Sequence, residues 1–147
     1  MSDTTPHGTA SPDPVPHDHG SHDQAGRYGR AVADELRPLA RELRQAIPDT
    51  YRGFAEFHKG AFAAGALDVR TKELIALAIA VTERCDGCIA AHAASLARAG
   101  GTRQQAAEAI GVAMLMTGGP GTVYGPRAYA AVCEHIPATE PDAGAGG

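Results

Sequence analysis

The chain of 147 residues lacks tryptophan, and aromatic residues of all kinds make up only 5% of it. Its hydrophobic content of 44% is still sufficient for the core of one domain. Such a core must therefore consist mainly of Ala, Leu, Ile and Val side chains. No apolar stretch is long enough to cross a bilayer and no signal peptide is visible, so we expect a location in the reducing cytoplasm.

Basic residues are absent from the first 26 positions, where four aspartates and four histidines lie among Pro, Gly, Ser and Thr. This segment has no apolar periodicity, so we expect residues 1–26, and likewise residues 138–147, to form disordered tails. The rest of the chain is balanced in charge, because all 13 basic residues and 13 of the 17 acidic ones lie there. This balance excludes an extended basic surface and argues against a nucleic-acid partner. We interpret the arginines at 30, 37, 41 and 44 as the solvated face of a helix.

Alternation of apolar and polar residues with a period of two, which marks a half-buried strand, is also missing. Proline and glycine instead separate segments of helix length, which predicts an all-α domain over residues 27–137, a compact bundle of about six helices. We expect Asp68 to cap the third helix, and Thr102 with Gln105 to form a capping box before the fifth. Residues 74–81 are apolar on every face and should be buried, as should the aromatic side chains of the second helix. The expected helices are about 30–46, 48–65, 68–82, 88–99, 102–116 and 123–135.

Cysteines are few, but two of the three stand beside a histidine in Cys85-Asp-Gly-Cys88-Ile-Ala-Ala-His92. Two intervening residues allow a pair of thiols to close a disulfide, and a thiolate is the nucleophile in disulfide exchange and in peroxide reduction. Free backbone N–H groups at a helix start favour the thiolate of Cys88. His92 follows one turn later on the same face, where it can exchange a proton with that sulfur. The spacing therefore indicates thiol redox chemistry.

A zinc site is the main alternative for a Cys-x-x-Cys pair. Structural zinc needs four ligands, yet neither a second Cys-x-x-Cys nor a His-x-x-x-His follows the motif. Cys133 could complete a set of three cysteines and one histidine, but it lies far downstream in an apolar helical pattern and is more simply a core residue. We therefore expect no metal at the motif.

The segment Lys72–Val81 extends the pattern upstream of the cysteines. With Glu73 placed twelve positions before Cys85, the ordered set Glu73, Cys85, Cys88 and His92 resembles the AhpD-like alkylhydroperoxidases of the carboxymuconolactone decarboxylase family. The resemblance covers about residues 50–135. It implies a small helical fold that forms homo-trimers or homo-hexamers and uses neither metal nor flavin as a cofactor.

The resemblance also implies roles for the four residues. Cys88 attacks the peroxide, Cys85 is the resolving thiol, His92 belongs to a proton relay, and Glu73 orients or charges that histidine. In the best-known peroxidases of this family a second histidine stands immediately before the second cysteine, whereas this chain has Gly87 there.

The residues alone leave the identity of the relay acid open. Glu73 lies roughly 16 Å from the end of its helix, so it meets His92 only if the two helices cross suitably. A first-turn acid that favours the helix dipole is an equally good interpretation of Glu73. Glu83, two residues before Cys85, is the rival acid, and a solvent-exposed helix end is its simplest interpretation.

The sequence therefore predicts a cysteine-dependent peroxidase or thiol–disulfide oxidoreductase that reduces organic hydroperoxides. Its partners would be a hydroperoxide or disulfide substrate and a thioredoxin-like or lipoyl reductant, with no nucleic acid and no membrane. One alternative is a lactone decarboxylase, as in the members that give the family its name, which are recognised without a cysteine pair. Another is a non-enzymatic module that senses redox state or holds zinc.

Overall fold

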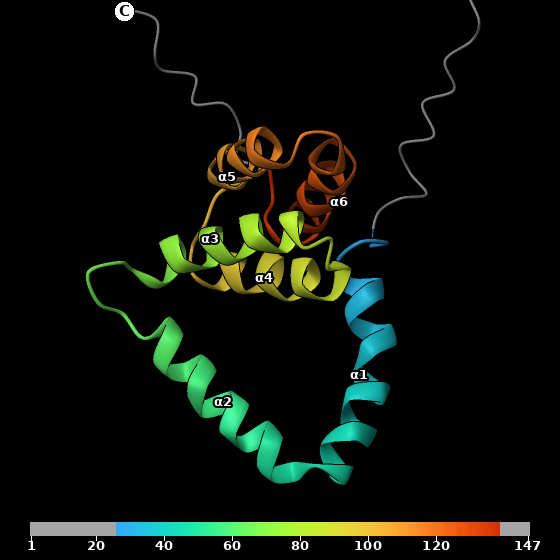
Figure 1. The fold of residues 1–147 in the computed structure, drawn as a ribbon. Helices are drawn as coiled ribbons and strands as arrows, with labels where there is room; N and C mark the ends of the chain where they lie inside the picture. Colours follow the sequence, from blue (N-terminus) through green and yellow to red (C-terminus); the bar gives the residue numbers. More distant parts are fainter. Residues whose placement is uncertain (1–25, 139–147) are drawn as a thin grey trace, which may run out of the picture.

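The computed structural model describes residues 26–138, so the predicted tails lie outside the described residues except at their inner ends. Within this range the chain forms six α-helices and no strand, which confirms the expected all-helical fold (Figure 1). No helix in this range is both long and apolar enough to span a bilayer. The helices are α1 (Arg30–Ala46), α2 (Pro48–Phe62), α3 (Val69–Thr82), α4 (Asp86–Arg98), α5 (Arg103–Thr117) and α6 (Gly119–His135).

Local sequence signals set several helix starts as expected. The Asp68 carboxylate accepts the backbone N–H of Thr71 at 2.7 Å and caps α3. Hydrogen bonds from Thr71, together with the charge of Arg70, hold the pKa of Asp68 below its usual range. Thr102 and Gln105 form the predicted capping box of α5. Helix α6 begins earlier than expected, at Gly119, because a proline is tolerated in the first turn of a helix.

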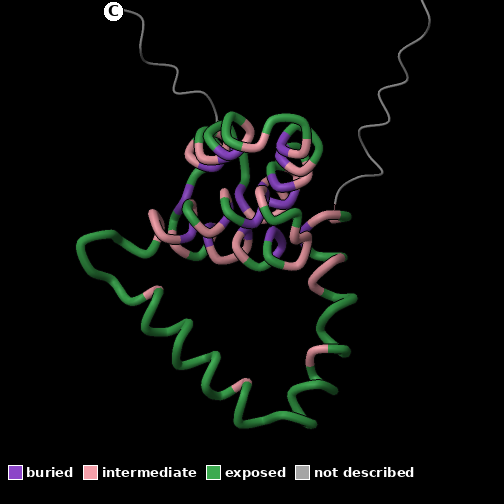
Figure 2. The backbone as a smooth tube through the Cα atoms, viewed as in Figure 1, coloured by how far each residue is buried: buried purple, intermediate pink, exposed green. Residues whose placement is uncertain are grey.

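Helices α3 to α6 surround one aliphatic core (Figure 2). Alanines fill much of it and allow the helices to approach closely. A Cβ atom at Gly121 of α6 would lie 2.7 Å from the Cα of Met114 in α5, so these two helices touch through their backbones. The composition thus predicted the character of this core correctly. Its largest fully buried side chains are Leu77, Val81, Ile89, Leu96 and Val132.

Helices α1 and α2, together called the arm, stand away from this core as a V (Figure 1). Neither helix contains a buried residue, and Phe54 and Phe57 are 65% and 72% exposed. The expectation that the aromatic side chains of α2 belong to the core is therefore wrong for these two. An amphipathic pattern shows which face of a helix is apolar, but it does not show that the same chain covers that face.

Two anchors hold the ends of the arm. At the start of α1, the Glu134 carboxylate of α6 accepts backbone N–H groups of Tyr28, Gly29 and Arg30 at 2.7–3.2 Å. At the end of α2, Nζ of Lys72 donates to the carbonyls of Ala61 and Ala63 at 2.9 and 2.7 Å. The arm is therefore tied to the core at both ends.

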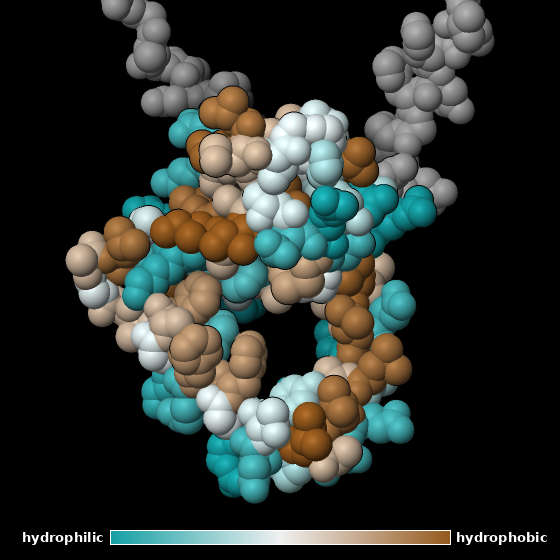
Figure 3. Space-filling model, in the orientation of Figure 1, coloured by the Kyte–Doolittle hydropathy of each residue, from teal (hydrophilic) through white to brown (hydrophobic). Residues whose placement is uncertain are grey.

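Helix α3 is less buried than its sequence indicated. Ile75 and Ile79 are 45% and 54% exposed, because α3 packs against α4, α5 and α6 on one side only. Figure 3 shows the resulting row of apolar side chains over α3, and further apolar surface over α1. The described chain therefore presents apolar surface both on the arm and on the core.

Candidate functional site

A tight turn joins α3 to α4 and places the cysteine pair. Arg84 adopts a left-handed conformation with φ of 55°, and its N–H donates to the Val81 carbonyl at 3.2 Å. The N–H of Cys85 donates to the Ala80 carbonyl at 3.1 Å. These two bonds form a Schellman motif, which reverses the chain immediately before α4. Cys85 therefore becomes the residue that caps α4.

Cys85 and Cys88 are joined as a disulfide across the first turn of α4. Their Cα atoms lie 5.2 Å apart, within the usual range for such a bond. The sulfur of Cys85 accepts the N–H of Cys88 at 3.2 Å, so it also serves as the N-cap of the helix. Cys88 is exposed and Cys85 is half-buried. A molecule in solvent can therefore reach Cys88 more easily than Cys85.

Glu73 and His92 meet where α3 crosses α4. Oε2 of Glu73 lies 2.8 Å from Nδ1 of His92, and their side chains are 6% and 21% exposed. Glu73 is the one buried charged residue of the described chain. Because an isolated buried carboxylate is costly, the contact with an imidazole explains how this position tolerates an acid. Helices α3 and α4 therefore cross so that Glu73 reaches His92, which is the condition that the sequence set for a contact between the two.

The structure separates the two candidate acids. Glu73 lies in the second turn of α3, beyond the first turn where an acid favours the helix dipole. Glu83 is exposed at the end of α3, and within residues 26–138 its side chain makes no hydrogen bond or ion pair. Glu73, and not Glu83, is the carboxylate in contact with His92.

Aromatic residues of α2 approach His92 from the arm. The ring of Phe62 stacks on His92 with centroids 5.7 Å apart, and His58 stacks on Phe62 at 4.5 Å. Sequence reasoning missed both contacts. The spacing of His58 and Phe62, one helical turn apart, was a signal that they share a face, but nothing local showed that α2 returns to α4.

Helix α1 covers the other end of the motif, at Gly87. A Cβ atom at Gly87 would lie 2.8 Å from Cδ1 of Leu36. Leu36 thus occupies the space into which a side chain at this position would extend. The family's usual histidine could stand here only if the flexible end of Leu36 moved aside.

Helix α6 contributes one further contact that the sequence did not reveal. Nη1 of Arg127 lies 3.6 Å from the carboxylate of Asp86, the first residue of α4. The same guanidinium lies over the rings of Tyr124 and Tyr28, at 4.8 and 5.6 Å from their centroids. Arg127 therefore links the start of α4 to α6.

No cluster of three or more His, Cys, Asp and Glu side chains suited to a metal ion occurs among residues 26–138. Cys133 is a free, half-buried cysteine of α6. The chemistry that the described groups offer is that of a thiol pair beside a carboxylate–imidazole pair.

Comparison with known proteins identifies the family to which the chain belongs. A model of the carboxymuconolactone decarboxylase family matches residues 48–131. The chain belongs to this family. The match includes α2 to α5 and most of α6, and with them all four residues of the predicted site. The resemblance recognised in the sequence is thereby confirmed.

Two bacterial relatives are similar to this chain over most of their own length. An uncharacterized protein of Cupriavidus necator is 40% identical over 88 residues, which are 60% of this chain and 78% of the relative. An uncharacterized protein from the cox locus of Paracoccus denitrificans is 42% identical over 81 residues, 55% of this chain and 73% of the relative. The crystal structure of a carboxymuconolactone decarboxylase family protein from Legionella pneumophila, in its apo form, aligns with a TM-score of 0.71 and 34% identity. The alignment covers 75% of this chain and 97% of the Legionella pneumophila chain.

Proposed function

We propose that this member of the family is a cysteine-dependent oxidoreductase that reduces organic hydroperoxides in the cytoplasm through the Cys85–Cys88 pair. The observation that supports it most is the position of Cys88, exposed in the first turn of α4 and already bonded to Cys85. His92 lies one turn further along α4 and is held by Glu73. A nucleophile, a resolving thiol and a proton donor are thus gathered within one short stretch of the fold.

The reaction begins from the reduced pair. The thiolate of Cys88 attacks the terminal oxygen of the hydroperoxide, so an S–O bond forms and the O–O bond breaks. The departing alkoxide takes a proton from His92 and leaves as an alcohol. Cys88 is then a sulfenic acid.

Resolution follows within the same turn. The Cys85 thiolate attacks the Cys88 sulfur, an S–S bond forms, the S–O bond breaks, and hydroxide leaves as water after gaining a proton. A dithiol reductant, thioredoxin-like or lipoyl, then supplies two electrons and two protons and restores both thiols. In this cycle Glu73 keeps the ring of His92 oriented.

We further propose that the working protein is a homo-oligomer, a trimer or hexamer as the resemblance implies. The arm supports this, because several of its large apolar side chains are largely exposed within the described chain. Exposed apolar surface of this extent is typical of contacts between subunits. Large apolar side chains that are more than two fifths exposed on the arm and at the joint between its helices are Leu36, Leu39, Leu43, Ile47, Phe54 and Phe57.

The test is turnover of cumene hydroperoxide with dithiothreitol as the reductant. Cys88→Ser should abolish turnover, whereas Cys133→Ser, the matched control, should retain it. Cys85→Ser should react once and accumulate a sulfenic acid that dimedone labels at Cys88. Equal turnover by the wild type and Cys88→Ser would exclude the proposed role of Cys88. If lactone decarboxylation were instead found, and it persisted without both cysteines, the decarboxylase alternative would hold.

A further inference from the structure

A groove of about 430 Å³ runs between α1 and α4 beside the redox pair. Its floor is formed by Gly87 and Ala91 of α4, and Leu36 and Ala40 contribute to its wall on α1. Gly87 directly precedes Cys88, and Ala91 directly precedes His92. The floor of the groove is therefore the strip of the α4 surface next to the face that carries Cys88 and His92. Leu36 already lies over Gly87, whereas the small side chain of Ala91 lets a ligand lie close to the backbone of α4 one turn further along.

Three arginines of α1, Arg37, Arg41 and Arg44, line the same groove. Arg37 is paired with Asp34 at 2.8 Å. Within residues 26–138, Arg41 and Arg44 have no carboxylate at ion-pair distance. The groove thus has an apolar floor and positive charge available along one wall. This combination suits an apolar chain that carries an anionic group.

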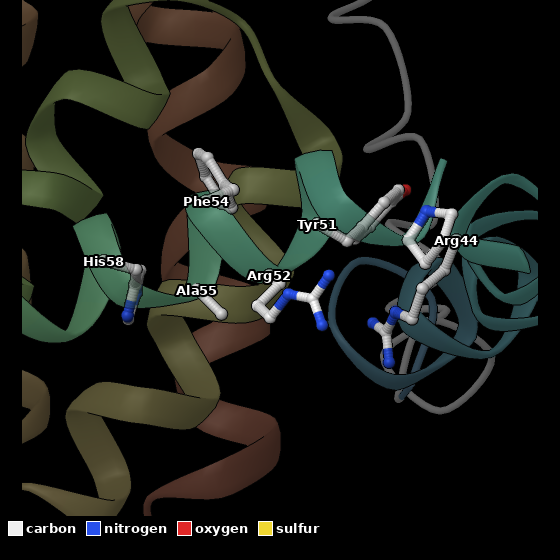
Figure 4. Close-up of a pocket in the computed structure, with 7 residues that line it drawn as sticks. Arg44, Tyr51, Arg52, Phe54, Ala55 and His58 are labelled. Atoms are coloured by element: carbon white, nitrogen blue, oxygen red, sulfur yellow. The ribbon is translucent and has the colours of Figure 1, made fainter. Parts of the chain in front are cut away.

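The positive charge continues at the elbow between α1 and α2. Arg44 lies over the ring of Tyr51, with its guanidinium carbon 5.2 Å from the centroid. It also lines a second hollow, of about 610 Å³, together with Arg52 of α2 (Figure 4). Figure 4 shows the side chains of Arg44 and Arg52 near one another at this elbow. Because Arg52 is paired with Asp49, Arg44 is the arginine that supplies positive charge at this end of the groove.

Phe62 restricts the approach to His92 from the other direction. Its ring covers one side of the imidazole, and Lys72 holds the end of α2 on which it stands. The end of α2 meets the core near the start of α3, whereas α1 meets it near the start of α4 (Figure 1). The groove along α1 therefore lies near the start of α4, where Gly87 in its lining is the direct neighbour of Cys88.

We propose that this groove binds a long-chain carboxylic acid that carries a hydroperoxide within its chain. The acyl chain lies over Ala91 and against Leu36, the carboxylate is bound by Arg41 and Arg44, and the hydroperoxide group reaches Cys88. Arg44 follows Leu36 by eight residues, about 12 Å along the helix axis, so the two groups must be well separated along the chain. This substrate class rests on the proposed peroxidase function, and the reaction is the same one.

The experiment compares three hydroperoxides: that of linoleic acid, that of its methyl ester, and cumene hydroperoxide. The wild type should prefer the acid to the ester. The double variant Arg41→Gln/Arg44→Gln should raise KM for the acid about tenfold or more, with little change in kcat, and should remove the preference. Arg70→Gln/Arg98→Gln removes the same charge outside the groove and should keep the preference.

Binding is measured separately, through the fluorescence of cis-parinaric acid, which needs no turnover. The probe should bind the wild type and the control variant, and should bind the Arg41/Arg44 variant about tenfold more weakly. Wild type that binds the probe in this way but does not reduce cumene hydroperoxide would contradict the proposed function and leave the groove assignment standing. Equal probe binding by all three proteins would overturn the groove assignment, whatever the peroxidase result. A change of oligomer mass in the Arg41/Arg44 variant would also overturn it, since the groove would then be a contact between subunits.

Discussion

Glu73 and His92 are nineteen positions apart in the sequence and 2.8 Å apart in the structure. The carboxylate is buried in α3, and the imidazole stands on α4 one turn after Cys88. A buried acid in contact with a histidine holds that ring in one orientation. The pair therefore connects the core of the protein to the helix that bears the two cysteines.

Replacing Glu73 with Gln should lower peroxidase turnover about 10- to 100-fold, because the amide keeps the shape and one acceptor but loses the charge. His92→Gln should cost at least as much, and the double variant should cost little more than His92→Gln alone. The measurement is kcat with cumene hydroperoxide. Glu83→Gln is the matched control and should be unaffected; a loss comparable to that of Glu73→Gln would return Glu83 to the site.

Gly87→His should raise the peroxidase rate only if Leu36 is shortened as well. The new side chain meets Cδ1 of Leu36, which lies 2.8 Å from the position of its Cβ atom. We expect Gly87→His/Leu36→Ala to exceed both single variants in kcat/KM. Rates for the double variant at or below that of Leu36→Ala would show that a histidine here adds nothing to the relay.

Asp68→Ala should destabilise the protein at pH 7, and the difference from wild type should shrink in acid. The pKa of Asp68 in the folded state is lowered, so its contribution is present above the unfolded pKa of about 3.9 and is lost as pH falls through the lower folded value. Urea midpoints between pH 7 and pH 3 measure this. Asp68→Asn keeps a capping acceptor without the charge and should be less destabilising at pH 7. A difference between wild type and Asp68→Ala that stays constant with pH would contradict this account.

Arg84→Gly should stabilise the protein, by about 1 kcal/mol, because an L-residue in the left-handed region carries a conformational cost that glycine avoids. Thermal or urea unfolding measures the gain. The same change at Arg41, which lies inside α1, should destabilise by a similar amount. Should Arg84→Gly prove destabilising, the side chain of Arg84 would have a stabilising role that its contacts do not reveal.

Phe57→Asp should reduce the oligomer mass if the arm forms subunit contacts. Its ring is 72% exposed in the single chain, so in a monomer the change should alter stability by only about 0.5 kcal/mol or less. Light scattering after size exclusion gives the mass. Lys59→Asp, an exposed neighbour on α2, is the control. A wild type that elutes as a monomer would contradict the subunit contact directly.

Much of the fold could be predicted because its signals are local. Asp68, Thr102 and the prolines mark helix starts through contacts within a few residues, and the structure has these caps as expected. The bounds of α1 were predicted to the residue despite Pro38 in its interior. The exposure of Phe54 and Phe57 could not be predicted, since it depends on whether α2 packs onto its own chain.

The sequence by itself determined the six-helix pattern, the aliphatic core and the placement of Cys85, Cys88 and His92 about one helix start, because helical periodicity brings residues three and four apart together. Only the tertiary structure decided that Glu73 and not Glu83 meets His92, that Leu36 lies over Gly87, and that Phe62 covers the imidazole. These contacts depend on how helices distant in sequence cross, and the crossing is set by packing of the whole core rather than by any local pattern. The cysteine pair was therefore visible in the sequence, and the family resemblance named Glu73, but the contact of Glu73 with His92 and the cover over that ring were not.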